Sequence, residues 1–175
     1  MLWWLKKLFK NPAGIGSIAP SAPALAKLMT SSLTPQARVL ELGPGDGAIT
    51  SEILKKLASP SQLELIEADH DLGDICSSKF PGVAVHHGDV EDFLRDRGDK
   101  FDFIISGIPF AAMDKEKRRR VFSQIKEHLN PDGSYVMFQY STTTLKEIKD
   151  LFGNSKVDFT PLNVPPAFVF TCIKK

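Results

Sequence analysis

The sequence lacks most of the features that mark specialised protein classes. Its two cysteines, Cys76 and Cys172, lie far apart, and the pair His86–His87 has no further ligand at metal spacing, so we expect reduced core thiols and no metal. No stretch approaches the roughly 20 apolar residues that a membrane-spanning helix needs. There is no internal repeat or low-complexity linker, and a formal net charge of +1 argues against a chain-wide nucleic-acid surface.

What the sequence does contain fits one globular α/β domain. Its 175 residues are 42% hydrophobic and 25% charged, which is typical of a cytosolic protein with a full-sized core. Apolar runs alternate with helical patterns. Strands are expected at 38–42, 62–67, 83–87, 101–106 and 134–140, with a terminal strand pair at 156–160 and 167–173. Helices are expected at 22–33 (capped by Ser21), 48–57, 70–79 (Ile75 and Cys76 inward), 90–97, about 115–129, and 145–152.

A glycine turn follows the first of these strands. Glu41 lies near the strand end, and Gly43, Gly45 and Gly47 follow before the next helix. Glycine supplies positive φ and lets a ligand approach the backbone closely. The G-x-G-x-G spacing differs from the G-x-G-x-x-G of dinucleotide sites, and Glu41 would repel a pyrophosphate but attract a cation. The turn therefore favours S-adenosylmethionine, which carries a sulfonium and an ammonium, over a purely structural turn.

Acidic residues also follow the second and third strands. Glu67 ends the second strand, where this architecture places a carboxylate on ribose hydroxyls; an exposed strand-end acid is the alternative. Asp89 follows the third strand, and it could cap the next helix as well as contact a ligand.

The exit of the fourth strand is the expected place for chemistry, because ligands lie at the carboxyl ends of parallel strands. Enzymes that methylate base amines place Asn or Asp where this chain has Ser106. A serine has no carboxamide, so Gly107, Ile108, Pro109 and Phe110 predict an apolar, backbone-lined pocket instead. Tyr140 ends the fifth strand at the same edge, either as a phenol that lines the substrate or as an ordinary strand aromatic.

Two clusters of positive charge stand out. Lysines and arginines at 115–120 begin a helix, where positive charge opposes the helix dipole. Either they form a solvated face, or Arg118 and Arg119 bind an anion such as a phosphate at the rim of the site. At the N-terminus, an amphipathic pattern combines Trp3 and Trp4 with Lys6, Lys7 and Lys10. It suits either a membrane interface or a helix docked over the domain itself.

Taken together, these motifs resemble the small bacterial, Rhodobacter-type phospholipid N-methyltransferases, a family of class I S-adenosylmethionine-dependent methyltransferases. The resemblance spans nearly the whole chain and lies in residues 11–12, 18–21, 41–45, 65–69, 106–109, 138–140 and 163–167. It implies a Rossmann-like α/β fold over residues 34–175, with a seven-stranded, mostly parallel sheet and a C-terminal antiparallel hairpin. Residues 1–33 would form N-terminal amphipathic or lid helices.

The resemblance also implies an activity and a set of site residues. The activity is stepwise methyl transfer to the amine of phosphatidylethanolamine and its mono- and dimethyl products, by a cytoplasmic protein attached peripherally to the inner membrane. Tyr140 would be catalytic, and Asp89 would hold the adenine amino group with Val90 near the ring. The expected cofactor set is Glu41, Gly43, Gly45, Gly47, Glu67, Ala68, Asp89, Val90 and Ser106. The alternatives are an rRNA adenine N-methyltransferase and a non-enzymatic membrane-associated protein that keeps the cofactor fold.

Overall fold

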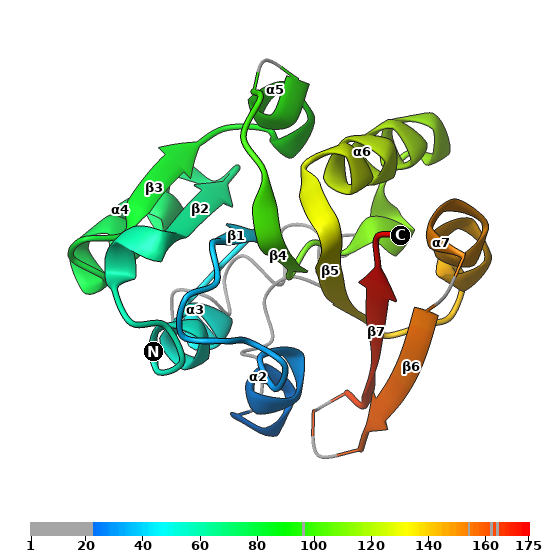
Figure 1. Cartoon of the computed structure of the whole chain (residues 1–175), viewed down its shortest axis with the longest axis horizontal. Coiled ribbons are helices and arrows are strands. Elements are labelled where there is room, and N and C mark those ends of the chain that lie inside the picture. Colours follow the sequence, from blue (N-terminus) through cyan, green and yellow to red (C-terminus); the bar gives the residue numbers. More distant parts are fainter. Residues whose placement is uncertain (1–22, 96, 154, 162, 164) are drawn as a thin grey trace.

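The centre of the fold is a sheet of short strands. These strands are apolar because helices cover both faces of the sheet. The computed structural model describes residues 23–95, 97–153, 155–161, 163 and 165–175 (Figure 1). The strands are β1 (Val39–Leu42), β2 (Leu63–Glu67), β3 (Ala84–His87), β4 (Phe101–Ser106), β5 (Leu129–Gln139), β6 (Ser155–Thr160) and β7 (Ala167–Ile173). The α-helices are α2 (Pro23–Met29), α3 (Ala48–Leu54), α4 (His70–Lys79), α5 (Val90–Arg95), α6 (Lys115–Glu127) and α7 (Leu145–Phe152), with short 3₁₀ turns η2 (Pro60–Gln62) and η3 (Phe110–Ala112).

The strands form one seven-stranded sheet in the order β3-β2-β1-β4-β5-β7-β6. Strands β1 to β5 pair in parallel, whereas β7 pairs antiparallel with both β5 and β6. The predicted Rossmann-like fold with a C-terminal antiparallel pair is therefore confirmed. The strand order reverses between β1 and β4, the point at which open α/β sheets bind their ligands.

Alternating side chains divide the core into two layers, one on each face of the sheet. Leu40 and Leu42 of β1 belong to the layer that includes α5, α6 and α7. Val39 belongs to the layer that includes α2, α3 and α4, and both layers can be followed in Figure 1. Glu41 has the same parity as Val39, so its carboxyl is buried on the α3 side.

Some local features differ from those expected. Ile75 is 43% exposed while Cys76 is fully buried, because the buried face of α4 passes through Gly73 and Cys76 rather than Ile75. Helices α2, α3 and α5 are shorter than predicted. Strand β5 begins at Leu129, before the expected start at 134, and it includes residues 130–133, where the register with β4 shifts. Asp132, at φ 60°, donates its N–H to the Lys174 carbonyl, so the C-terminal segment pairs with this irregularity.

The loops after β1 and β4 meet through their backbones. The Gly107 N–H donates to the Leu42 carbonyl at 2.9 Å. A Cβ at position 107 would lie 2.7 Å from the Gly43 carbonyl oxygen. Gly43 itself has φ +69° and donates its N–H to the Ile66 carbonyl at 2.9 Å. Glycine at 107 is thus required by close approach, and glycine at 43 by backbone conformation.

The N-terminal tryptophan–lysine segment with Trp3, Trp4, Lys6, Lys7 and Lys10 lies outside the described residues, as does Ser21. Among the described helices, none has the length and apolar character needed to cross a membrane.

We predict that Gly107→Ala destabilises the protein by about 1–3 kcal/mol, the usual cost of overpacking. The added methyl group would meet a backbone oxygen that cannot rotate away. Gly98→Ala is the matched control, because a Cβ there meets nothing within 4 Å. Urea unfolding of the two variants checks this, and equal stability of both would contradict the proposed contact.

Candidate active site

The glycine turn after β1 forms one wall of the site. Gly43, Gly45 and Gly47 all have positive φ, at +69°, +59° and +78°. A Cβ at Gly47 would lie 2.4 Å from the Phe80 ring, so the end of α4 packs against this part of the turn. At Gly45, by contrast, a Cβ would meet nothing within 4 Å. The turn therefore leaves its backbone open to a ligand at Gly45.

Glu41 is buried, and it has no cationic partner among the described residues. Its Oε2 accepts a hydrogen bond from the Thr50 hydroxyl at 2.7 Å, while Oε1 has no hydrogen-bond partner among the described residues. Burial is the main cause that raises the pKa of this carboxyl to about 8, and the nearby Glu67 and Asp46 add to it against the Thr50 hydrogen bond. Glu41 is thus neutral at pH 7, and it has one oxygen ready for a donor or a cation.

The other predicted cofactor residues follow β2 and β3. Glu67 accepts hydrogen bonds from the N–H groups of Gly45 (3.1 Å) and Asp69 (3.0 Å), and Ala68 beside it is exposed. A carboxylate has about four lone-pair positions, so Glu67 keeps capacity for hydroxyl donors.

Asp89 has two partners already. It caps α5 through the Glu91 N–H at 2.9 Å and accepts from Lys117 Nζ at 2.6 Å. Burial would raise the pKa of Asp89, but these hydrogen bonds lower it, so the carboxylate is charged. Val90 packs in the core with 6% exposure, so any contact with a ligand would come from its backbone.

The Ser106 side chain is turned into the protein. Ser106 is fully buried, its Oγ accepts from the Ile108 N–H at 3.1 Å, and its side chain is hydrogen-bonded to that of Tyr135. The sequence places Ser106 in the cofactor set; the structure limits that role to its backbone. The Phe110 ring is also fully buried, packing 4.6 Å from the Phe122 ring, so it does not line the expected pocket.

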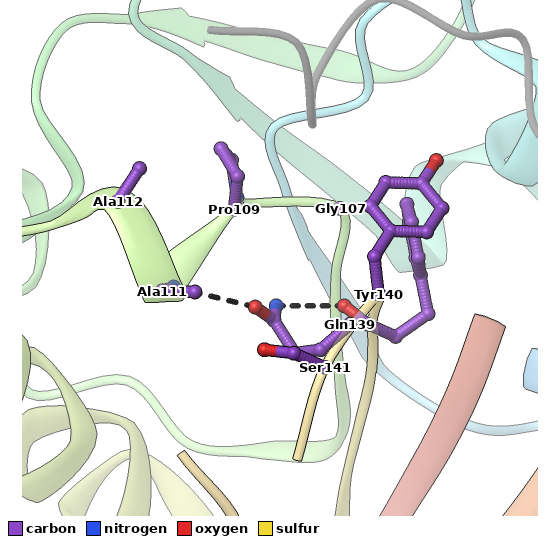
Figure 2. Close-up of a pocket in the computed structure, with 8 residues that line it drawn as sticks. Gly107, Pro109, Ala111, Ala112, Gln139, Tyr140 and Ser141 are labelled. Atoms are coloured by element: carbon purple, nitrogen blue, oxygen red, sulfur yellow. Dashed lines mark hydrogen bonds between the residues drawn. The ribbon is translucent and has the colours of Figure 1, made fainter. Parts of the chain in front are cut away.

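A pocket of about 150 Å³ opens where β4 and β5 end (Figure 2). Gln139, which the sequence did not single out as a site residue, fixes one wall: its Nε2 donates to the Ile108 carbonyl at 2.9 Å, and its Oε1 accepts from the Ala111 N–H at 3.4 Å. A glutamine at the end of a buried strand was the available signal. The lining residues are Gly107, Pro109, Ala111, Ala112, Phe138, Gln139, Tyr140 and Ser141.

Tyr140 lies at the edge of this pocket, directly after β5. Its ring meets the Phe138 ring edge-on at 5.6 Å, and its side chain is hydrogen-bonded to that of Asn163. Burial raises the pKa of Tyr140, and the Asn163 hydrogen bond opposes that shift. The phenol is therefore protonated at neutral pH, a state that suits a hydrogen-bonding group rather than a base.

Most of the basic residues at the start of α6 are paired with carboxylates. Arg118 makes two hydrogen bonds to Glu147, at 2.7 and 2.8 Å, and also donates to the carbonyls of Phe110 and Met113. These bonds to Arg118 lower the pKa of Glu147. The guanidinium of Arg118 thus joins α6 to α7 and to the pocket loop, and its binding of a substrate anion stays a prediction. Arg119, paired with Glu116 at 3.4 Å, keeps 55% side-chain exposure.

The thiols add no chemistry to this site. Both cysteines are free and buried, and burial raises the pKa of each to about 12. They therefore remain protonated at neutral pH. The described part of the chain contains no group of three or more His, Cys, Asp or Glu side chains that could hold a metal ion.

We predict that Glu41→Gln changes how stability depends on pH. The pKa of Glu41 rises from 4.5 to about 8 on folding, so the neutral carboxyl stabilises the fold fully below pH 4.5, and that stabilisation is lost as pH rises to 8. Relative to Glu41→Gln, the wild type should lose up to a few kcal/mol over this range, at about 1.4 kcal/mol per pKa unit. Urea unfolding between pH 5 and 8.5 checks this, and parallel curves would contradict it.

Comparison with known proteins agrees with this geometry. Residues 39–133 match the family described as "Methyltransferase domain". An ornithine lipid N-methyltransferase of Singulisphaera acidiphila is 31% identical over 179 aligned residues, covering 97% of this chain and 93% of that protein. Ribosomal RNA small subunit methyltransferase A of Pseudomonas syringae pv. tomato is 42% identical over 62 residues, which cover 34% of this chain and only 22% of that protein.

A solved structure supports the fold. The O-methyltransferase from Bacillus cereus in complex with SAH has a TM-score of 0.69 and 18% identity, over 98% of this chain and 90% of that chain. With more than half of its length matched by the family, and with a relative aligned almost end to end, the chain belongs to the methyltransferase-domain family, whose class I members use S-adenosylmethionine.

Proposed function

We propose that this protein transfers methyl groups from S-adenosylmethionine to the amine of a membrane lipid headgroup. The observation that carries the proposal is the pocket at the ends of β4 and β5, which is lined mainly by small and apolar groups and places Tyr140 at its edge. The end-to-end similarity to an ornithine lipid N-methyltransferase supports a lipid acceptor. The proposed acceptors are phosphatidylethanolamine, with its mono- and dimethyl products, and ornithine lipid, because each of these lipids carries an amine nitrogen.

The residues around the glycine turn fit the cofactor. The unpartnered Glu41 Oε1 suits a cationic group, and the open backbone at Gly45 admits close approach. We assign the amino acid part to Glu41 and the glycine turn, and the ribose hydroxyls to Glu67. Ala68, Asp89, and the backbones of Val90 and Ser106 would face the rest of the molecule. When bound, S-adenosylmethionine supplies an electrophilic methyl group on its sulfonium.

The close contact between Gly107 and Gly43 places the acceptor pocket beside the cofactor turn. Gly107 lines the pocket, and its backbone packs on Gly43. A headgroup amine held by Gly107, Ile108 and Pro109 would therefore lie near the bound methyl donor without a large movement of the chain. Such positioning accounts for much of the acceleration in a direct displacement.

The acceptor must lose a proton before it can react, because an ammonium has no lone pair. A primary amine has a pKa of about 10 in water. The walls formed by Pro109, Ala111, Ala112 and Phe138 disfavour the charged amine by limiting its hydration. Tyr140 can accept a hydrogen bond from the amine, and its ring can face the methylated cation. These groups lower the cost of deprotonation and hold the lone pair toward the methyl donor.

We further propose that the tryptophan–lysine segment at residues 1–10 brings the enzyme to the membrane. Trp3 and Trp4 suit the headgroup level, and Lys6, Lys7 and Lys10 suit anionic lipid. Arg119 is the member of the basic rim that could reach a headgroup anion, because its side chain is the more exposed of the two proposed.

An rRNA adenine N-methyltransferase is the second candidate, favoured by the 62-residue match to an enzyme of that name. The paired arginines weaken it, because RNA binding depends on cations that are free to meet phosphates. The absence of a carboxamide at Ser106 weakens it as well.

The acceptor is tested by incubating the enzyme with methyl-labelled S-adenosylmethionine and, in separate arms, vesicles of phosphatidylethanolamine, vesicles of ornithine lipid, or ribosomal RNA. We expect label in one of the lipids. We also expect Tyr140→Phe to lower turnover about tenfold, the loss that corresponds to about 1.4 kcal/mol in the transition state. Label in RNA alone would overturn the proposal, and full turnover by Tyr140→Phe would exclude a role for its hydroxyl.

Membrane binding is tested by flotation with vesicles that contain anionic lipid, comparing the full chain with one that lacks residues 1–10. We expect the full chain to float and the shortened chain to remain at the bottom. As a matched control, Lys146→Gln and Lys156→Gln alter exposed lysines elsewhere and should leave flotation unchanged. Equal flotation of the full and shortened chains would rule out anchoring by this segment.

A further inference from the structure

The loop between β6 and β7 is brought to the acceptor pocket by the antiparallel pairing of β7. Gln139, at the end of β5, pairs with Phe168 at the start of β7. Thr160, at the end of β6, pairs with Ala167. Because β5 ends at the pocket and β7 is its neighbour, the connection from β6 enters β7 at Ala167 next to the end of β5. A segment distant in sequence therefore contributes to the surroundings of the phenol.

Asn163 is the polar residue that this loop directs inward. Its side chain belongs to a residue with only 1% exposure. Its Nδ2 donates to the Pro165 carbonyl at 2.7 Å, and the side chain is also hydrogen-bonded to that of Tyr140. The amide is thus anchored to its own loop while it holds the Tyr140 hydroxyl. A buried amide is expensive unless its groups are paired, so both interactions have to persist.

The two tyrosines of this chain differ in their surroundings. Tyr135 is fully buried in the core, where it lies beside Ser106 and Met137 and away from the pocket lining. Tyr140 is only partly buried, lines the pocket, and is hydrogen-bonded through its side chain to Asn163. The ring contact with Phe138 limits the tilt of the Tyr140 ring. It does not fix the direction of the hydroxyl, which is hydrogen-bonded to Asn163.

We propose that Asn163 is a positioning residue for methyl transfer, which fixes the Tyr140 phenol at the acceptor pocket. This inference rests on the proposed function, in which Tyr140 meets the acceptor amine. Asn163 does not itself line the pocket. Its loss should leave the pocket walls in place but allow the phenol to rotate, and the oxygen would then meet the amine in only a fraction of complexes. The effect should fall mainly on kcat, with little change in KM.

A measurement that requires no lipid tests the contact itself. The chain has two tyrosines, so ring-labelled tyrosine gives two carbon signals by NMR, and Tyr140→Phe assigns them. In Asn163→Ala we expect the Tyr140 signal to move and its titration to shift to higher pH, because the hydrogen bond that lowers its pKa is gone. The Tyr135 signal should stay in place, which also shows that the variant is folded. An unchanged Tyr140 signal would overturn the proposal.

A double-mutant cycle tests the functional part. Asn163→Ala should reduce kcat about tenfold in the wild-type background, close to the effect of Tyr140→Phe, since about 1.4 kcal/mol corresponds to a factor of ten. In the Tyr140→Phe background it should cause no further loss, because Asn163 acts through the hydroxyl. Multiplicative losses in the double variant would overturn the positioning role and indicate a purely structural one.

Thr160→Val provides the matched control in the same hairpin. Thr160 is buried at 6% exposure, and the substitution is nearly equal in volume. We expect normal kcat and an unchanged Tyr140 signal, and a loss equal to that of Asn163→Ala would count against Asn163. If wild-type enzyme methylates neither lipid, the proposed function fails, whereas the NMR result still decides whether Asn163 holds Tyr140.

Discussion

The contact between the backbones of Gly43 and Gly107 is the constraint on which the rest of the site depends. It brings together two loops that leave neighbouring parallel strands at the point where the strand order reverses. One loop carries the glycine turn, and the other lines the pocket proposed for the acceptor. Because neither position tolerates a side chain, the two binding regions share a wall that is only backbone thick. In the proposed function, donor and acceptor would then meet without a domain movement.

The charged groups around this backbone contact differ in whether they are paired. At the rim, each of Lys117, Arg118, Arg119 and Arg120 has a carboxylate partner. Inside, Glu41 has no cationic partner in the described part of the chain, and its burial is costly once it ionises. A cationic ligand would relieve that cost, whereas the paired rim gains little from a new anion. Glu41, the buried carboxyl that a cationic ligand would stabilise in its ionised form, therefore lies where the cofactor is proposed to bind.

The sequence predicted those helices and strands whose bounds depend on neighbouring residues in the chain. The bounds of β4, α7 and β7 match the expectation, because continuous apolar runs or a clear helical stripe end at turn residues. What it could not reveal depends on residues far apart in the chain. Arg118 and Glu147 are 29 positions apart, so nothing in the basic run shows that its guanidinium is already committed.

The same holds for the irregularity in β5. Asn130 to Gly133 have the composition of a free turn, but pairing with Lys174 keeps them in the strand. Among the site residues, Glu41 and the glycines follow from local pattern. Gln139 and Asn163 do not, because their roles come from bonds across the sheet and from a hairpin that only the topology brings near.

The antiparallel course of β7 also decides where the chain leaves the domain. Ile173 pairs with Ser134, near the amino end of β5, whereas Phe168 pairs with Gln139 beside the pocket. Lys174 is held there through its N–H to the Gly133 carbonyl and its Nζ to the Leu129 carbonyl. An affinity tag, fluorophore or solid support attached after Lys175 would emerge at the edge of the sheet opposite the pocket. The enzyme could be immobilised by its C-terminus with its reactive edge still facing a supported bilayer.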